Sequence, residues 1–321
     1  MKRVTFAMFV FLVTAVLFSG CSGNQRERGE KISIVATIFP QYDWVRQIIG
    51  EENMDRFDLT LLVNSGVDLH SFSPSVSDIA KIKTCDVFIH VGGHSDNWVR
   101  NVLRDANADI ITMNLLGMLG SGLLIIDDAH VCDECGEVHD PHHHADEHVW
   151  VSLKRAKIIC AAIAAMLSEA DPDNAQAYKN NLEAYTAKLS ALDAEYQAAA
   201  DAANVRTLVF ADRFPFRYLT EDYKLDHYAA FHGCSAETEA SFATIASLAN
   251  NLNRLKLNVV MVTESSDQSI ARTVINNTTD KNQRILVLDS VQSVTAAGVI
   301  NGAAYLSIME NNLAVLKEAL M

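Results

Sequence analysis

Histidines and cysteines crowd one polar stretch in the middle of this chain, residues 130–148. The stretch holds six of the eleven histidines and two of the six cysteines. Imidazole and thiolate are the side chains that borderline-soft divalent metals prefer. Few apolar residues accompany them, so we predict a solvated loop over residues 127–147 rather than a core element. The candidate metal-capturing residues of this loop are His130, Cys132, Cys135, His139, His142, His143 and His144.

The two cysteines of this loop, Cys132 and Cys135, leave alternatives open. They are spaced to hold a metal together, to form a disulfide or to form half of a structural zinc ribbon. A ribbon needs a second Cys-x-x-Cys, which the sequence lacks. A thioredoxin-like redox role is disfavoured because the pair does not open a helix after a strand. We therefore favour a low-affinity loop that captures metal.

The N-terminus predicts export. Two basic residues precede an apolar run over residues 4–17, which leads into Phe-Ser-Gly-Cys21. The run has roughly 14 residues, fewer than the ~20 of a membrane-spanning helix. Its end resembles a bacterial lipobox, in which Cys21 is lipidated and becomes the first mature residue. We expect a signal peptide over 1–21, a tether over 22–30, and a protein anchored by lipid to the outer face of the cell membrane.

Charge and length narrow the possible partners and architecture. The formal net charge of −14 disfavours nucleic acid as a partner and favours a cationic ligand. The ~290 residues after the tether are sized for two domains. We expect a monomer.

Strand and helix patterns alternate on both sides of the histidine-rich stretch, which predicts an α/β fold with mainly parallel sheets. Between the two alternating regions, an Ala- and Leu-rich pattern predicts a helix of roughly 30 residues. We therefore expect two α/β lobes joined by one long connecting helix. The predicted bounds are 31–171 for the N-terminal lobe, 172–203 for the linking helix and 204–321 for the C-terminal lobe. The strands are expected at 32–39, 57–63, 86–91, 109–113, 206–210, 226–231, 258–263 and 284–288.

Four short motifs in the expected order resemble the metal-binding lipoproteins of ABC-type zinc and manganese importers. They are Gly66-Val-Asp-Leu-His70-Ser-Phe-Ser-Pro74, Asp146-Glu-His148-Val-Trp, Thr263-Glu264 and Leu288-Asp289-Ser290. The resemblance covers essentially the whole mature chain. It implies that His70, His148 and Asp289 bind the metal between the lobes, with Glu264 nearby. It also implies a membrane permease and its ATPase as partners.

Two of these residues also follow predicted strands, which supports the resemblance. His70 comes after the second strand and Asp289 after the last one. Open α/β sheets place their ligands at the carboxyl ends of strands. The alternative to metal binding is that His70 is a capping or surface histidine and that Asp289 caps the N-terminus of a helix.

The third ligand position of the family is where this sequence departs from the pattern. Aligned on the aromatic pair after the fifth strand, the ligand slot falls on Ala211, which cannot bind metal. Asp212 is one residue away and is a candidate, although it could instead pair with a neighbouring arginine. His232 is a further candidate, with a turn residue as the alternative.

The soft donors favour Zn(II) as the transported ion, with Mn(II) as the alternative and nickel left open. Surface adhesion, metal storage and metal-dependent hydrolysis are the rival functions. No motif of a hydrolase is present, so we expect that the chain is not an enzyme.

Overall fold

The computed structural model describes residues 31–106, 108–128, 142–231 and 240–321, with the backbone alone at 126–128 and 142–144. The predicted signal peptide and tether, with Cys21, lie outside these ranges. So do His130, Cys132, Cys135, His139 and His232. Among the helices of the described ranges, none is long and apolar enough to cross a bilayer.

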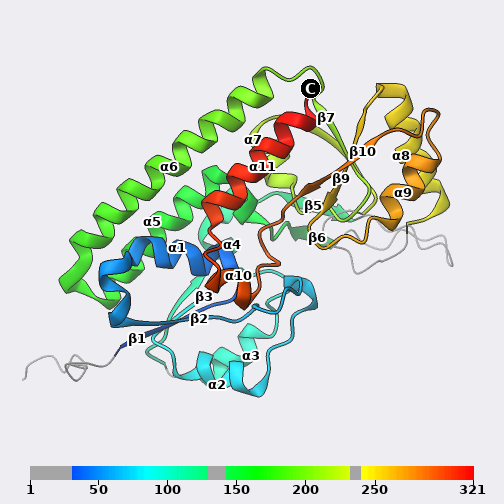
Figure 1. Cartoon of the computed structure of the whole chain (residues 1–321). Coiled ribbons are helices and arrows are strands. Elements are labelled where there is room, and N and C mark those ends of the chain that lie inside the picture. The colour runs from blue at the N-terminus through cyan, green and yellow to red at the C-terminus, as the bar shows by residue number, and fades with distance from the viewer. Residues whose placement is uncertain (1–30, 107, 129–141, 232–239) are drawn as a thin grey trace, which may run out of the picture.

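The first sheet is parallel and has the strand order β2-β1-β3-β4. Its strands are β1 (Ile32–Ala36), β2 (Phe57–Leu61), β3 (Val87–His90) and β4 (Ile111–Asn114). The connecting helices are α1 (Phe39–Ile49), α2 (Val76–Thr84) and α3 (Val99–Arg104), and α4 (Leu115–Leu119) follows β4. The part of the chain built on this sheet is called the first lobe (Figure 1).

The second sheet is also parallel, with the order β10-β9-β7-β8. Its strands are β7 (Thr207–Phe210), β8 (Asp226–Ala229), β9 (Val259–Thr263) and β10 (Arg284–Leu288). Its helices are α7 (Arg217–Asp222), α8 (Phe242–Leu255), α9 (Ser269–Asn276), α10 (Ala296–Ile300) and α11 (Tyr305–Ala319). The predicted α/β fold with two mainly parallel sheets is confirmed, and this part of the chain is called the second lobe.

One long helix spans both lobes, as predicted. Helix α5 (Leu153–Ala170) is followed by Asp171 as its C-cap, and α6 (Ala175–Asp201) then runs for 27 residues, about 40 Å at 1.5 Å per residue. In Figure 1 it runs from α1 of the first lobe to α11 of the second. The Tyr196 hydroxyl near its C-terminal end donates to the Met309 carbonyl of α11 at 2.6 Å. A single hydrophobic cluster contains residues of both lobes and α6, so the lobes share one core.

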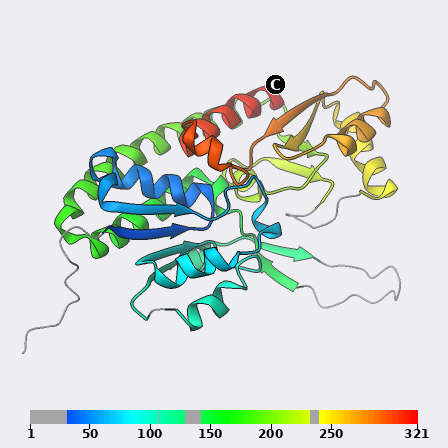
Figure 2. The same ribbon diagram turned by 60° about the horizontal axis from the view of Figure 1, so that its bottom comes forward.

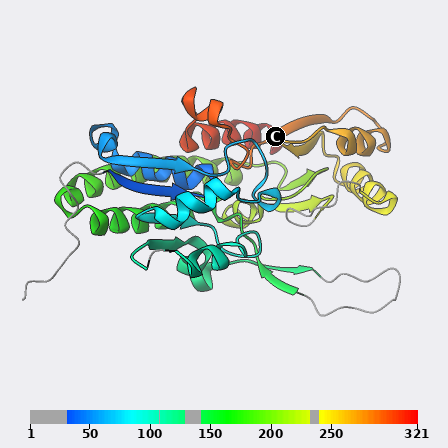
Figure 3. The same ribbon diagram turned by 90° about the horizontal axis from the view of Figure 1, so that it is seen from below.

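The predicted irregular loop over residues 127–147 is partly wrong. Strands β5 (Ile125–Asp128) and β6 (His142–Ala145) pair as an antiparallel hairpin, with Asp128 opposite His142. His142, His143 and His144 therefore belong to a strand. An antiparallel ribbon satisfies backbone hydrogen bonds without a buried apolar face, which is why hydrophobic patterning did not reveal it. Figures 2 and 3 show the hairpin projecting from the body of the protein.

Candidate metal centre

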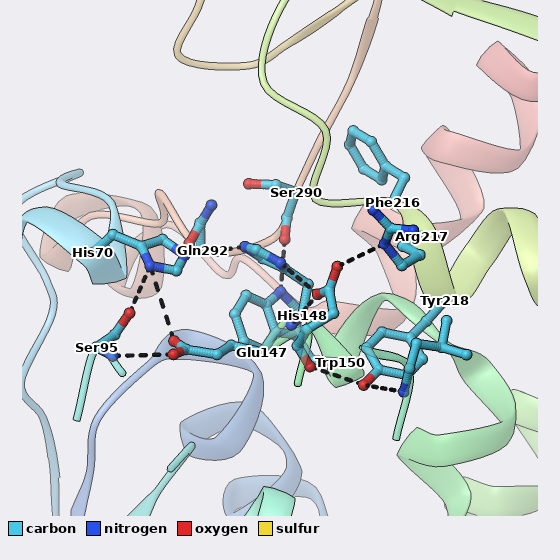
Figure 4. Close-up of polar contacts among 12 residues, drawn as sticks. His70, Ser95, Glu147, His148, Trp150, Phe216, Arg217, Tyr218, Ser290 and Gln292 are labelled. Atoms are coloured by element: carbon cyan, nitrogen blue, oxygen red, sulfur yellow. Dashed lines mark hydrogen bonds and ion pairs between the residues drawn. The ribbon is translucent and has the colours of Figure 1, made fainter. Parts of the chain in front are cut away.

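Two of the three principal predicted ligands, His70 and His148, meet in the structure. His70 lies in a 3₁₀ turn (Leu69–Ser71) beyond β2, and His148 immediately precedes another (Val149–Val151). Their Nε2 atoms are 3.3 Å apart (Figure 4). Two imidazoles on one tetrahedral zinc, each at ~2.0–2.1 Å, have nitrogens roughly 3.3–3.4 Å apart. The two side chains therefore lie at the separation that a shared zinc ion requires.

His148 is oriented by Asp146, the residue two positions before it. One carboxylate oxygen of Asp146, Oδ1, accepts from the His148 backbone N–H at 2.9 Å and lies 2.8 Å from its Nδ1. With Nδ1 donating to the carboxylate, the neutral ring presents an unprotonated Nε2 to a metal. Both residues are buried, and His148 is 1% exposed. Burial acts to raise the pKa of Asp146, but the contacts with His148 and Arg217 outweigh it and hold the pKa below its usual value.

His70 is supported by a different set of groups. Ser95 Oγ lies 2.5 Å from its Nδ1, and Oε2 of the buried Glu147 carboxylate lies 3.9 Å from the same atom. The backbone N–H of Ser95 donates to Glu147 Oε1 at 3.0 Å, which ties these two groups together. Asp68 accepts from the His70 backbone N–H at 2.8 Å. As at His148, hydrogen bonding at Nδ1 leaves Nε2 directed at the other histidine.

The loop after β3 brings Ser95 to this position because it contains two glycines with positive φ. Gly93 has φ +82°, and a Cβ on it would stand 2.5 Å from Glu147 Oε1. Only glycine therefore lets the backbone approach the buried carboxylate this closely. Sequence reasoning missed Ser95 and Glu147. The signals that could have found them are the Gly-Gly pair at a strand end and the carboxylate next to His148.

Asp289 follows β10 in the second lobe, at the strand end where it was predicted. Its Oδ1 accepts from the Val291 backbone N–H at 2.7 Å. Burial, reinforced by the nearby charge of Glu264, raises the pKa of Asp289 to about 6. Glu264 accepts two hydrogen bonds from Ser290, which fixes the turn that carries Asp289.

Asp289 does not complete a metal cluster in this conformation. Within the described ranges, no group of three His, Cys, Asp or Glu side chains is close enough to hold an ion. Val291, two residues on, is fully buried at φ +65°. A β-branched residue in this region is strained, and such strain collects at functional sites.

Ala211 and Asp212, where the resemblance places the third ligand, make other contacts instead. Ala211 is buried in the core of the second lobe. Asp212 Oδ2 accepts from the backbone N–H and the hydroxyl of Thr263, at 3.0 and 2.8 Å, and its Oδ1 accepts from the Arg213 N–H. Asp212 therefore links the ends of β7 and β9 through Thr263, a role that the sequence did not suggest, and its contact with Arg213 is to the backbone N–H.

The sequence also matches known proteins. A family model described as ZnuA, "Zinc-uptake complex component A periplasmic", matches residues 34–319. The chain belongs to the ZnuA family. This membership confirms the resemblance to zinc-importer binding proteins. It also confirms the expectation that the chain is not an enzyme, because the ZnuA family is one of zinc-uptake components.

Individual ZnuA-like relatives are moderately similar. The zinc-binding lipoprotein AdcA of Streptococcus pneumoniae is 29% identical over 319 residues, which cover 99% of this chain and 61% of AdcA. The chain thus spans about three fifths of the length of that relative. The high-affinity zinc uptake system protein ZnuA of Bacillus subtilis is 28% identical, with 97% and 94% of the two chains covered.

Solved structures of other proteins share the fold. The metal-dependent lipoprotein YcdH of Bacillus subtilis superposes with a TM-score of 0.73 at 26% identity, covering 91% of this chain and all of that one. The Zn(II)-bound ZnuA-like domain of Streptococcus pneumoniae AdcA gives 0.71 at 27% identity, covering 90% and 99%.

Proposed function

We propose that this protein is the extracytoplasmic zinc-binding component of an ABC importer, which captures Zn(II) between the lobes and delivers it to a membrane permease driven by an ATPase. The observation that carries the proposal is the 3.3 Å separation of the His70 and His148 Nε2 atoms. Family membership and the zinc-binding names of the relatives support it.

In this proposal, two neutral imidazoles from the first lobe form the fixed half of the site. Asp146 keeps His148 in the tautomer that binds through Nε2, and the contact of the Ser95 hydroxyl with His70 Nδ1 holds the His70 ring in place. Asp289 supplies a carboxylate from the second lobe after a small adjustment of the lobes. Metal binding would relieve the cost of its buried charge, which is the cost that raises its pKa. Asp212 and His232 remain weaker candidates for a further ligand.

The remaining predictions about the chain extend this proposal. Lipidation at Cys21 would hold the protein on the outer face of the cell membrane, and residues 22–30 would let the body move there. The histidines and cysteines of residues 130–144 would collect zinc at low affinity and pass it to the interlobe site. The predicted lobe boundaries, 31–171 and 204–321 on either side of the linking helix 172–203, stay part of the same proposal.

Zinc titration of the purified protein tests the proposal, with binding measured by competition against a chromogenic chelator. We expect one tight zinc ion that is lost in His70→Ala and in His148→Ala. His227→Gln is the matched control, because His227 lies on β8 in the second lobe, where its ring stacks on that of Phe214. Tight zinc retained by the His70→Ala/His148→Ala double variant would refute the site. A tighter hold on Mn(II) than on Zn(II) would favour the manganese alternative.

Deletion of residues 129–141 separates transport from storage. An importer component keeps its one tight site without this segment and loses only weak binding. If the deletion removes the tight ion as well, the metal-store alternative is favoured. Zinc-dependent hydrolysis of a substrate without any partner would favour an enzyme.

A further inference from the structure

Both histidines of the site belong to the same short unit, an aspartate followed two residues later by a histidine. The units are Asp68-Leu-His70 and Asp146-Glu-His148. In each unit the aspartate Oδ1 accepts from the backbone N–H of its histidine, at 2.8 and 2.9 Å. The remaining oxygen, Oδ2, contacts groups of the second lobe in both cases, and that of Asp68 also accepts from Gln292 Nε2 at 3.2 Å.

Each of these outer oxygens faces an arginine of the second lobe. Arg213 Nη1 lies 3.9 Å from Asp68 Oδ2, and Arg217 Nε lies 3.5 Å from Asp146 Oδ2. The dashed line at Arg217 in Figure 4 is this contact of its Nε with Asp146 Oδ2. The two arginines are four residues apart and come from the segment that leads from β7 into α7. One short segment of the second lobe therefore places an arginine near the aspartate of each Asp-x-His unit of the first lobe.

The pair at Asp146 is an ion pair without a hydrogen bond. Within the described residues, neither Asp146 Oδ2 nor Arg217 Nε has a hydrogen-bond partner, and both atoms are buried. The Asp146 side chain is fully buried, whereas that of Asp68 is 16% exposed. A buried carboxylate without a nearby cation is strongly destabilising. In the protein without zinc, Arg217 supplies this cation, and Arg213 adds a weaker contribution at Asp68.

We infer that Arg213 and Arg217 act as substitute cations, which stabilise the two Asp-x-His units before zinc arrives and weaken the hold on zinc afterwards. This inference rests on the proposed function, because it places zinc between His70 and His148. A bound zinc ion brings its own positive charge to the same units, so the arginines are no longer needed to compensate the charges of the two aspartates. The arginines then only repel the ion.

The sign of the effect distinguishes this role from two others. A fixed cation separated from a divalent ion by one carboxylate and one imidazole weakens binding by roughly three- to tenfold, even at a water-like dielectric. Removing it therefore strengthens zinc binding and destabilises the zinc-free protein. If the arginines merely held the fold, their removal would lower stability and leave affinity unchanged. If they oriented the ligands, their removal would lower affinity.

The test uses Arg213→Gln, Arg217→Gln and the double variant of the full chain, with zinc itself as the probe. Arg272→Gln is the control, since Arg272 is exposed on α9 and its loss changes the net charge equally. We expect each site variant to bind zinc roughly three- to tenfold more tightly and the double variant more tightly still. The control should stay within about twofold of the parent. The melting temperature should fall without zinc and recover with it.

Lysine substitutions provide the rescue. Arg213→Lys and Arg217→Lys keep the charge but lose the planar guanidinium, so the affinity should return to the parental value. Unchanged or weaker zinc binding by the glutamine variants would overturn the inference. If Arg217→Gln does not fold, the comparison of Arg213→Gln with Arg213→Lys still decides the sign. Adding His148→Ala to Arg213→Gln should abolish tight binding; zinc retained there would refute the proposed site, not the arginine effect.

Discussion

The indole N–H of Trp150 donates to the carbonyl of Ser290 at 2.8 Å, across the two lobes. Trp150 stands two residues after His148, and Ser290 directly follows Asp289. The Tyr305 hydroxyl donates to the Trp150 carbonyl at 2.7 Å, and both side chains are fully buried. The segments that carry a first-lobe and a second-lobe ligand candidate are thus joined directly, without a metal. Any adjustment that brings Asp289 to zinc must be small or must break this contact.

Replacing Asp146 with asparagine should weaken zinc binding by roughly 10- to 100-fold. The neutral amide of Asp146→Asn no longer selects the His148 tautomer with Nδ1 protonated, and it leaves Arg217 beside an uncharged group. Competition against a chelator measures the loss. Asp226→Asn, an exposed aspartate on β8, is the control. Parental affinity in Asp146→Asn would mean that His148 is not a ligand or is oriented by something else.

Removing the Ser95 hydroxyl should weaken zinc binding by about three- to tenfold, less than the change at Asp146. In Ser95→Ala, the 2.5 Å contact with His70 Nδ1 is lost, but Glu147 remains within reach of the ring. Calorimetric titration would show this as a change in affinity with one ion still bound. Ser121→Ala, at an exposed position, should have no effect. A loss larger than that of Asp146→Asn would reverse the order of importance assigned here.

A methyl group at Gly93 should disturb both the fold and the site. Gly93→Ala forces a side chain into φ +82° and against the buried Glu147 carboxylate, at a cost of roughly 1–3 kcal/mol in the free energy of unfolding. Ser95 should shift with the loop, so zinc affinity falls too. Gly122→Ala is the matched control, because a Cβ there meets nothing within 4 Å. Denaturant unfolding and zinc titration of both variants measure the two effects, and equal behaviour would contradict the steric argument.

Neutralising Asp289 should have opposite effects on stability and zinc binding. Burial and Glu264 raise its pKa to about 6 in the folded protein, above its value in the unfolded chain. The folded state therefore holds the proton more tightly, and this group costs stability progressively as pH rises from about 4 to 6. Asp289→Asn removes that cost, so the zinc-free protein should melt roughly 2–4 °C higher at pH 7 and unchanged at pH 4.

The same variant should bind zinc more weakly, and in the parent the affinity should rise with pH through about 6 as the proton is displaced. Thermal melts at the two pH values, with and without zinc, measure both effects. Asp280→Asn, in the exposed turn before β10, is the control. An Asp289→Asn protein that is destabilised at pH 7 without zinc would show that the buried charge is not a cost.

The sequence by itself determined the order of the parallel strands and of the helices longer than five residues, because each of these elements depends on periodicity and breakers that are local. The long helix, the parallel sheets and the strand-end positions of His70 and Asp289 all followed from such patterns. Helices α4 and α10, of five residues each, were not predicted, since a helix that short shows no period. The β5–β6 hairpin was missed for a related reason, because its strands have four residues each and show no alternation of apolar and polar side chains.

Only the tertiary structure decided what surrounds the two histidines. Ser95 and Glu147 support His70 because the turn after β3 packs against the segment before Val149. Arg213 and Arg217 reach Asp68 and Asp146 only because the second lobe lies against the first. These contacts join residues 25 to 145 positions apart in the chain. Local propensity carries no information about such pairs, because their distances are set by how the shared core brings the two sheets together.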